Sequence, residues 1–280
     1  MSSFGAALRQ AIDAQGPVCV GIDPHAPLLA AWGLEDSAAG ARDFGLRTIE
    51  AVAGLVAAVK PQAAFFERHG SAGVAALEDV ISAAREAGIL CIVDAKRGDI
   101  GSTMQGYADA FLRAGSSLAG DAVTLSPFLG FDSLTPALEL AQDQSKGVFV
   151  LCLTSNPEGA SVQLARTGGT SSVAADIAAG AARFNAAAAG RGELGSIGLV
   201  IGATIGEAAR TGHVDLAAVN GPLLVPGIGA QGGTPASVRA VVGEDSWRNV
   251  LASTSRAVLG AGPDIAALRE AAKKVTGEMA

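Results

Sequence analysis

Eight short apolar runs recur along this chain, and stretches with the composition and spacing of helices separate them. The runs cover residues 18–22, 56–60, 89–94, 122–125, 148–154, 197–201, 223–225 and 250–253. The clearest intervening stretches, rich in Ala and Leu, cover residues 41–57, 73–87, 101–114, 133–142 and 172–189. Regular alternation of strand and helix predicts a parallel sheet with helices packed against it.

Polar side chains and glycine gather where the apolar runs end. The residues at or just after those ends are Asp23, Lys60, Asp94, Ser126, Ser155, Thr204, Gly227 and Arg256. A doubly wound sheet is compatible with the same alternation, but in a closed barrel these ends meet at one mouth, where barrel enzymes carry their active sites. Because eight units in 280 residues also match a barrel in size, we predict an α/β fold, a (β/α)8 TIM barrel, with residues 1–280 forming one catalytic domain.

The charge and hydropathy of the chain exclude several classes of partner. The formal net charge is -7 with no block of Lys or Arg, so we expect no nucleic-acid or membrane surface. No apolar run approaches the roughly 18 residues of a membrane span, and residues 1–5 lack the features of a targeting segment. Cys19, Cys91 and Cys152 lie inside apolar runs, which is typical of buried thiols in a reducing compartment. We therefore expect a cytoplasmic protein.

The sequence DAKRGDIGST, residues 94–103, directly follows the third apolar run. If the chain is still extended at Asp94, side chains two positions apart point the same way, so Asp94 and Lys96 would face one side together. Asp99 lies three residues beyond Lys96, where a helix can begin. An ordinary surface ion pair followed by a helix cap is the simpler interpretation. So many ionised groups directly after a buried strand favour a catalytic array instead.

A glycine-rich sequence, PGIGAQGG at residues 226–233, follows the seventh run and precedes a helix expected near Thr234. Glycines let backbone N–H groups approach an anion closely, and a helix N-terminus adds a favourable dipole. Loops after the seventh and eighth strands of such barrels often bind phosphate, and Arg256 can add a bidentate contact. A tight turn without a ligand is the alternative. The candidate anion-binding glycines are Gly227, Gly229 and Gly232.

Together these stretches resemble orotidine 5'-phosphate decarboxylases. DAKRGDIGST is similar to the signature of that family, and PGIGAQGG is similar to its phosphate-gripping loop. LCLTSNP, residues 151–157, resembles the pyrimidine-contacting loop of a bacterial subgroup with longer loops. The resemblance extends from residue 21 to residue 256. It implies a homodimeric barrel that needs no cofactor or metal and converts orotidine 5'-monophosphate to uridine 5'-monophosphate and carbon dioxide.

That reaction explains the residue types in the signature. Loss of carbon dioxide from C6 leaves a carbanion that the pyrimidine ring delocalises poorly, so fixed charge must stabilise it. The resemblance implies that Lys96 supplies an ammonium at C6 and then the proton. It places Asp94 near the departing carboxylate, and it implies that Lys60 and Asp99 complete an array of alternating charge.

The resemblance also implies how the rest of the substrate is held. Asp23 would accept a hydrogen bond from the ribose, and Ser155 would read the amide edge of the pyrimidine. Binding energy from a remote phosphate can close loops over the reacting centre. The phosphate would be bound by Gln231 and Arg256. Across the dimer interface, the partner's site would receive Asp99, Ile100 and Thr103.

Simpler interpretations exist for several of these residues. Asp23 precedes a proline and could form a turn, Lys60 could be a solvated strand end, and Ser155 could begin a helix. No spacing suggests a metal site, and we expect the histidines and the arginine of the longest loop to serve the surface or packing. These residues are His25, His69, His213 and Arg166. The sequence assigns no role to residues 24–40 or to the loop expected over 156–172.

Two other functions are compatible with such a barrel. Related barrels such as keto-gulonate phosphate decarboxylase and hexulose phosphate synthase use an Asp-x-Lys-x-x-Asp array with magnesium on a sugar phosphate. Those enzymes need a further carboxylate near the second strand, where this chain has VKPQA at residues 59–63 and no acid before Glu67. A catalytically silent, nucleotide-binding barrel is the third possibility. A missing charge would favour it, but all four charged positions of the array are occupied.

Overall fold

The computed structural model describes residues 2–167, 169–229 and 232–279. In these residues eight parallel strands form a closed barrel in sequence order, and β1 pairs with both β2 and β8. The strands are β1 Val18–Ile22, β2 Ala58–Pro61, β3 Leu90–Arg97, β4 Ala122–Leu125, β5 Gly147–Leu153, β6 Ile197–Ile201, β7 Leu223–Pro226 and β8 Val250–Thr254. The barrel predicted from the alternation is confirmed.

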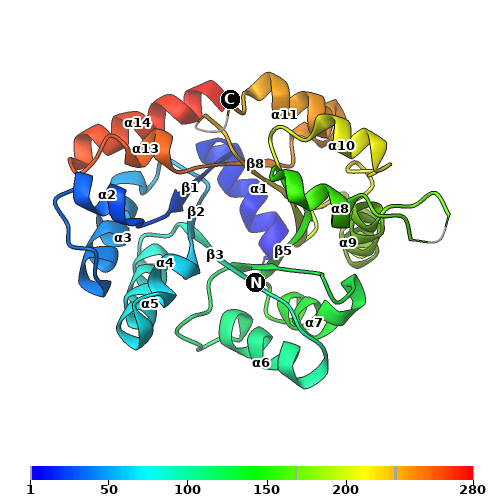
Figure 1. Ribbon diagram of the computed structural model, residues 1–280, viewed down its shortest axis with the longest axis horizontal. Helices are drawn as coiled ribbons and strands as arrows, with labels where there is room; N and C mark the ends of the chain where they lie inside the picture. The colour runs from blue at the N-terminus through cyan, green and yellow to red at the C-terminus, as the bar shows by residue number, and fades with distance from the viewer. Residues whose placement is uncertain (1, 168, 230–231, 280) are drawn as a thin grey trace.

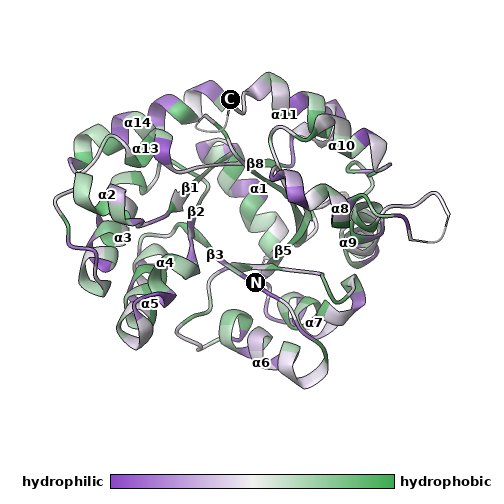
Figure 2. Cartoon of the chain, viewed as in Figure 1, coloured by the Kyte–Doolittle hydropathy of each residue, from purple (hydrophilic) through white to green (hydrophobic). Residues whose placement is uncertain are grey.

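Helices surround the barrel, and at least one α-helix follows every strand (Figure 1). The strands are mostly hydrophobic, whereas much of the strongly hydrophilic colour lies on the outer helices (Figure 2). The helices are α1 Phe4–Gln15, α2 Ala26–Ala31, α3 Ala38–Val52, α4 Ala63–Glu67, α5 Gly70–Glu86, α6 Gly101–Leu112, α7 Thr135–Asp143, α8 Ala160–Gln163, α9 Val173–Ala189, α10 Gly206–Thr211, α11 Pro235–Val242, α12 Glu244–Trp247, α13 Arg256–Leu259 and α14 Ile265–Met279. Two 3-10 turns, η1 Phe131–Leu134 and η2 Pro157–Gly159, complete the order.

Several element boundaries differ from the predicted ones because caps and turns set them. The helix expected over 41–57 begins at 38, after Ser37 caps it by accepting a hydrogen bond from Gly40 N at 3.2 Å. It ends at 52, shortly before Gly54 adopts a left-handed φ of 73°. The loop expected over 156–172 instead contains η2 and α8.

Helix α1 closes the end of the barrel where the strands begin. Phe4 and Leu8 are buried and pack against side chains inside the strands. The Phe4 ring meets the Phe149 ring edge-on with centroids 6.0 Å apart. It also occupies the space that a Cβ on Gly147, the first residue of β5, would need. Apolar packing therefore fills the barrel interior at this end, whereas the polar residues singled out in the sequence lie at the C-terminal ends of the strands, as predicted.

The cysteines and the helices agree with the expectations from composition. Cys19, Cys91 and Cys152 are buried free thiols. Burial raises the pKa of Cys19 and of Cys152 to about 12, so both remain protonated at neutral pH. Within the described ranges, no helix has both the length and the apolar character that a membrane crossing requires.

Candidate active site

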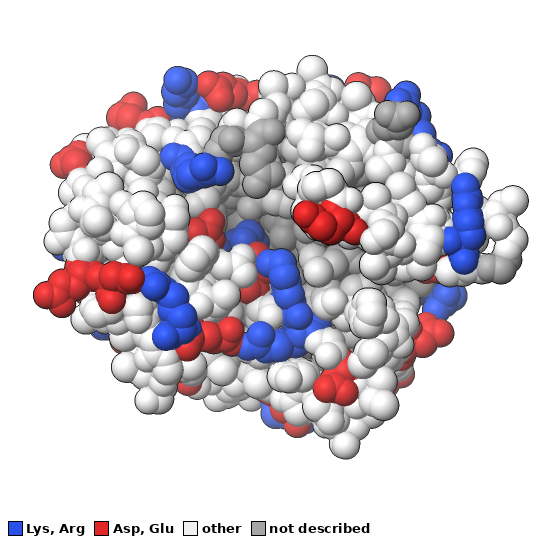
Figure 3. Space-filling view, in the orientation of Figure 1, with Lys and Arg blue, Asp and Glu red and all other residues white. Residues whose placement is uncertain are grey.

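Charged side chains gather at the mouth formed by the C-terminal ends of the strands. Figure 3 shows basic and acidic groups side by side in the hollow at the centre of the view. Lys60, near the end of β2, and Asp94, in β3, are only 7% and 5% exposed. Charged side chains are rarely buried to this degree unless they are paired. The alternative that Lys60 is a solvated strand-end residue is therefore wrong.

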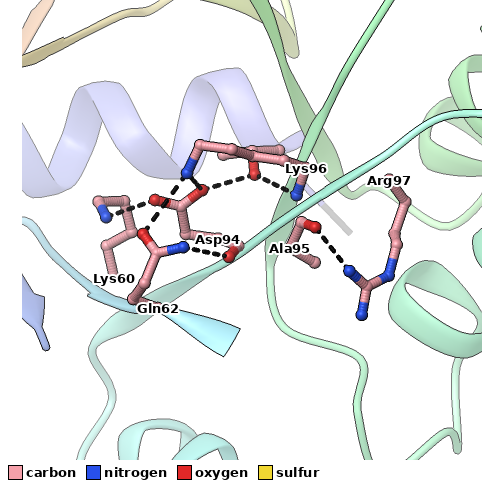
Figure 4. A network of polar contacts seen from close by, with 7 residues as sticks. Lys60, Gln62, Asp94, Ala95, Lys96 and Arg97 are labelled. Atoms are coloured by element: carbon pink, nitrogen blue, oxygen red, sulfur yellow. Dashed lines mark hydrogen bonds and ion pairs between the residues drawn. The ribbon is translucent and has the colours of Figure 1, made fainter. Parts of the chain in front are cut away.

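Asp94 joins two ammonium groups (Figure 4). Lys60 Nζ donates to Asp94 Oδ2 at 2.6 Å, and Lys96 Nζ donates to Asp94 Oδ1 at 2.6 Å. Gln62 lies beside them, because its Nε2 donates to the backbone oxygen of Asp94 at 3.2 Å and its Oε1 lies 3.4 Å from Lys96 Nζ. The Lys96 side chain is 43% exposed. One ammonium is thus buried, and the other is open to a ligand.

Asp94 and Lys96 face one side together, as expected, but ordinary strand alternation is not the reason. Lys96 adopts φ 47°, a left-handed conformation that L side chains rarely adopt. The register between β3 and β4 shifts between Val93 and Arg97. Thr124, in β4, accepts a hydrogen bond from Lys96 N at 3.0 Å and donates one to Asp94 Oδ1 at 2.8 Å.

Arg97 supports the same stretch from its other side. Its guanidinium donates to the backbone oxygen of Ala95 at 2.9 Å (Figure 4) and forms an ion pair with Glu67. It also lies over the rings of Tyr107 and Phe111, 5.8 and 5.5 Å from their centroids. Arg97 therefore anchors β3 to α4 and α6 and does not enter the mouth.

The pairing keeps both buried groups of the array charged. Burial alone would raise the pKa of Asp94, but the charges of Lys60 and Lys96 and their hydrogen bonds outweigh it and lower that pKa. Burial alone would lower the pKa of Lys60, but attraction to Asp94 and Asp23 raises it. At neutral pH the mouth therefore holds a fixed carboxylate beside a fixed ammonium.

A cavity of about 300 Å³ adjoins the array. Lys60 lies in its wall together with Asp23 from the first strand end and Arg256 from the eighth. Asp23 Oδ1 and Ser255 Oγ also face this region, and both atoms are buried without a hydrogen-bond partner among the described residues. Buried polar atoms rarely stay unpaired, so the cavity suits a polar ligand. Its other lining residues are His25, Phe65, Pro226, Gly227, Ile228, Ser253 and Thr254.

The glycine-rich loop has positive φ at three glycines, 103°, 76° and 81° at Gly227, Gly229 and Gly232, a region that glycine enters readily. Two of its N–H groups form hydrogen bonds within the loop. Gly229 N donates to Gly233 O at 3.0 Å, and Gly232 N donates to Gly229 O at 2.9 Å. Both N–H groups are therefore engaged within the loop. The following helix α11 begins after Thr234, as predicted, whereas Gln231 lies outside the described residues.

Ser155 lies just after β5, exposed beside a second cavity of about 430 Å³. Gln163 from α8 reaches the same strand end, where it accepts from Thr154 N at 3.0 Å and donates to Thr154 Oγ1 at 2.7 Å. Thr204, after β6, also lines this cavity. The short helix α8 is therefore attached to the strand end that carries Ser155.

Asp99 does not join the array of its own chain. Its carboxylate accepts a hydrogen bond from Ile100 N at 2.8 Å, and it forms no ion pair with a described Lys or Arg. Asp99 is half-buried, and Thr103, on the first turn of α6, is exposed. Ile100 is 61% exposed, and Phe128 and Leu129 after β4 are 78% and 54% exposed. Within one chain the predicted four-membered array therefore has three members.

The histidines and Arg166, which were expected to serve the surface or packing, lie in different parts of the molecule. His25 is in the cavity wall, with Nδ1 2.9 Å from the backbone oxygen of Asp23. Arg166 is exposed in the segment between α8 and α9, which we call the projecting segment. It contacts the backbone oxygens of Thr170, in the same segment, and of Thr211, at the end of α10. His69 lies before α5 and His213 follows α10. Among the described residues, no group of His, Cys, Asp and Glu could hold a metal ion.

Three residues near the array or the cavity were missed in the sequence. A weak signal existed for two of them, because Gln62 stands two positions after Lys60 and Thr124 is the polar residue of an apolar run. Ser255 lies in a run of Ser and Thr before Arg256, where no feature distinguishes it. Only closure of the barrel shows which of these side chains meet.

The sequence and the structure were compared with those of known proteins. The model of the Orotidine 5'-phosphate decarboxylase / HUMPS family matches residues 16–271. The Salinispora arenicola orotidine 5'-phosphate decarboxylase is 55% identical over 278 residues, which cover 99% of this chain and 97% of the relative. The crystal structure of a Streptomyces avermitilis protein assigned to this enzyme superposes with a TM-score of 0.93 at 53% identity, over 100% of this chain and 95% of that one. The Leishmania donovani OMP decarboxylase structure gives a TM-score of 0.77 at 35% identity, over 99% and 97% of the two chains. The chain therefore belongs to the orotidine 5'-phosphate decarboxylase / HUMPS family.

Proposed function

We propose that this protein converts orotidine 5'-monophosphate to uridine 5'-monophosphate and carbon dioxide in de novo pyrimidine biosynthesis. Full-length similarity to named decarboxylases supports the reaction. The structural observation that carries it is the Lys60, Asp94 and Lys96 array, which lies at the mouth of the barrel beside the 300 Å³ cavity. Preorganised charge in a largely buried site is what a poorly delocalised carbanion requires.

Lys96 is the group that acts on the substrate. As the bond between C6 and the carboxylate breaks, carbon dioxide leaves and the electron pair stays at C6, beside the Lys96 ammonium. Lys96 Nζ then gives one proton to C6 and regains one from water. Its partly exposed side chain can reach a ligand while Asp94, 2.6 Å away, keeps it positioned. Asp94 also lies near the departing carboxylate, and its own charge is balanced by Lys60.

The cavity and the strand ends around it hold the rest of the nucleotide. Asp23, whose Oδ1 lacks a partner among the described residues, accepts a hydrogen bond from a ribose hydroxyl. Ser155 reads the pyrimidine amide edge, beside the strand end that α8 covers. The phosphate is bound by Gln231 and Arg256 together with Gly227, Gly229 and Gly232. Because the N–H groups of Gly229 and Gly232 bond within the loop, these two groups could bind the phosphate only after the loop rearranges.

The magnesium-dependent rival finds less support in the geometry. Glu67, the first acid after the second strand, forms an ion pair with Arg97 behind the array. Formation of uridine 5'-monophosphate by the purified protein, followed with and without a chelator, tests the choice. We expect equal rates in both samples. Loss of activity on chelation would contradict a metal-independent reaction. No turnover of orotidine 5'-monophosphate in either sample would leave the sugar-phosphate class and the silent barrel, which turnover of a sugar phosphate with magnesium would separate.

The proposed active unit is a homodimer in which Asp99, Ile100 and Thr103 reach the partner's site. The failure of Asp99 to meet Lys96 within one chain and the exposure of Ile100 and Phe128 support this arrangement. Ser126 N donates to Arg97 O at 2.7 Å, so the segments that carry these apolar side chains run side by side. We also propose that residues 1–280 act as one catalytic domain in the cytoplasm, where buried free thiols persist.

A further inference from the structure

We propose that Thr124 is a positioning residue that holds Lys96 and Asp94 in the arrangement that decarboxylation needs. The inference rests on the proposed function. Thr124 is 1% exposed near the C-terminal end of β4. Its hydroxyl lies between the two groups, 2.8 Å from Asp94 Oδ1 and 3.0 Å from Lys96 N. It would not touch the substrate and acts through these neighbours.

The direction of both hydrogen bonds is determined by chemistry. A backbone N–H can only donate, so Thr124 Oγ1 accepts from Lys96 N. The single hydroxyl proton is then free for the Asp94 carboxylate, which can only accept while it is ionised. Each partner therefore has one role, and the hydroxyl cannot rotate to another acceptor without losing a bond.

The contact also closes a ring around the reacting ammonium. Lys96 Nζ donates to the same Asp94 oxygen that receives the Thr124 proton, at 2.6 Å. The backbone and the side-chain end of Lys96 are thus both tied, one through Thr124 and one directly, to a single carboxylate oxygen. Loss of the hydroxyl would release the backbone tie and one of the contacts that orient the carboxylate.

The backbone of Lys96 needs such a tie. A non-glycine residue at φ 47° persists only where its surroundings impose the conformation. The pairing between β3 and β4 is irregular here, between Val93 and Arg97, so regular ladder bonds do not impose it. The Thr124 hydroxyl accepts a hydrogen bond from Lys96 N, in place of the ladder partner that regular strand pairing would supply.

Packing alone does not explain a threonine at this position. The flanking residues of β4, Val123 and Leu125, are apolar and 1% exposed. Valine has nearly the same shape as threonine and avoids burial of a hydroxyl, which is unfavourable unless the hydroxyl is bonded. The hydroxyl is therefore explained by its two partners.

The test compares Thr124→Val with Thr124→Ser in steady-state turnover of orotidine 5'-monophosphate. We expect Thr124→Val to lower kcat on the order of 10- to 100-fold with KM changed less than about threefold, because small misplacements of reacting groups have effects of this size. Thr124→Ser keeps the hydroxyl and stays within about fivefold of wild type. Thr48→Val is the matched control, since Thr48 is another fully buried threonine whose hydroxyl bonds to Phe44 O at 2.8 Å in α3. Its kcat is expected to equal that of wild type.

A second readout does not depend on turnover. The Lys96 amide is expected to exchange with solvent deuterium slowly in wild type and in Thr124→Ser, and at least about tenfold faster in Thr124→Val. If the wild type fails to decarboxylate, the proposed function is wrong. Amide exchange still tests whether the Thr124 hydroxyl holds the Lys96 backbone. An unchanged kcat with unchanged exchange in Thr124→Val would overturn the inference, as would a loss expressed only in KM. If Thr124→Val does not fold, Thr124→Ala replaces it, and equal kcat values for Thr124→Ala and Thr124→Ser would be the contrary result.

Discussion

Arg256 is exposed at the wall of the cavity that also contains Asp23. A guanidinium can bind phosphate with two parallel hydrogen bonds. We therefore predict that Arg256→Ala raises KM for orotidine 5'-monophosphate on the order of 10- to 100-fold, the effect of losing a charged hydrogen-bonding partner. Steady-state kinetics of wild type and Arg256→Ala are measured with orotidine 5'-monophosphate and with orotidine, which lacks the phosphate. Wild type and variant should turn over orotidine equally, and Arg166→Ala, in the projecting segment, should leave both substrates unaffected.

Asp94 links the active site to the stability of the fold. Its folded-state pKa is lowered by Lys60 and Lys96 against the opposing effect of burial, so its stabilisation is present above the unfolded pKa of about 3.9. It is lost as the pH falls through the folded pKa. Asp94→Asn removes the ion pair of the buried Lys60, which costs about 3–5 kcal/mol at neutral pH.

Urea unfolding at a series of pH values measures the consequence. The difference in unfolding free energy between wild type and Asp94→Asn should shrink steadily as the pH falls below about 4. A difference that stays constant down to pH 2 would mean that Asp94 is not held ionised by its neighbours.

At the scale of residues, the contacts that depend only on chain direction are the easiest to predict from the sequence. Asp94, Lys96 and Lys60 stand at strand ends, so their meeting at the mouth could be predicted. The left-handed backbone of Lys96 could not, because it depends on a hydroxyl in the next strand. The engagement of the Gly229 and Gly232 N–H groups within their own loop was equally inaccessible, since glycine permits several conformations.

Among the elements, α1 has the clearest role apart from catalysis. Phe4 fills the end of the barrel far from the charged mouth, against Phe149 and Gly147. Phe4→Ala should therefore destabilise the protein by about 3–5 kcal/mol through lost burial and a residual cavity. Denaturant midpoints measure the loss, and kcat of the folded variant should stay at the wild-type value. A strong fall in kcat without a shift of the midpoint would contradict this role.

All eight strands were predictable as elements, and the predicted ends of β1, β4 and β6 are confirmed, whereas several other ends differ. The long helices α1 and α14 were not among the predicted stretches. Apolar runs indicate a strand but do not show where pairing stops, so β3 extends to Arg97 beyond the predicted end at 94. Helix ends depend on caps such as Ser37 and turns such as Gly54. α1 packs against strand residues far away in sequence, a contact that no local pattern encodes.

At the scale of the whole molecule, the proposed dimer shares its active sites. Lys96→Ala and Asp99→Asn homodimers should both be nearly inactive. When the two variants are mixed and allowed to exchange subunits, each hybrid dimer has one site with both residues intact. Random exchange makes half of the dimers hybrid, so we expect recovery of about a quarter of wild-type activity. Kinetics after mixing, with sedimentation as a check on dimer formation, measure it, and no recovery despite exchange would place Asp99 outside the partner's site.

The barrel as a whole was predictable because eight strand and helix units leave few other topologies. The assembly was not, since exposed side chains such as Ile100 and Phe128 indicate an interface only after folding brings them to one surface. Function depends on both the barrel and the proposed dimer. Lys60, Asp94 and Lys96 come from one barrel, and Asp99 is proposed to come from the partner barrel.

The most direct test of the central claim is release of labelled carbon dioxide from carboxyl-labelled orotidine 5'-monophosphate by wild type and by Lys96→Ala. Lys96 is partly exposed, and Asp94 retains Lys60 when Lys96 is removed, so the variant should fold. We predict release by wild type and a rate at least about 10⁴-fold lower for Lys96→Ala, since both charge stabilisation and proton transfer are lost. A folded Lys96→Ala protein that releases carbon dioxide within about tenfold of the wild-type rate would contradict it.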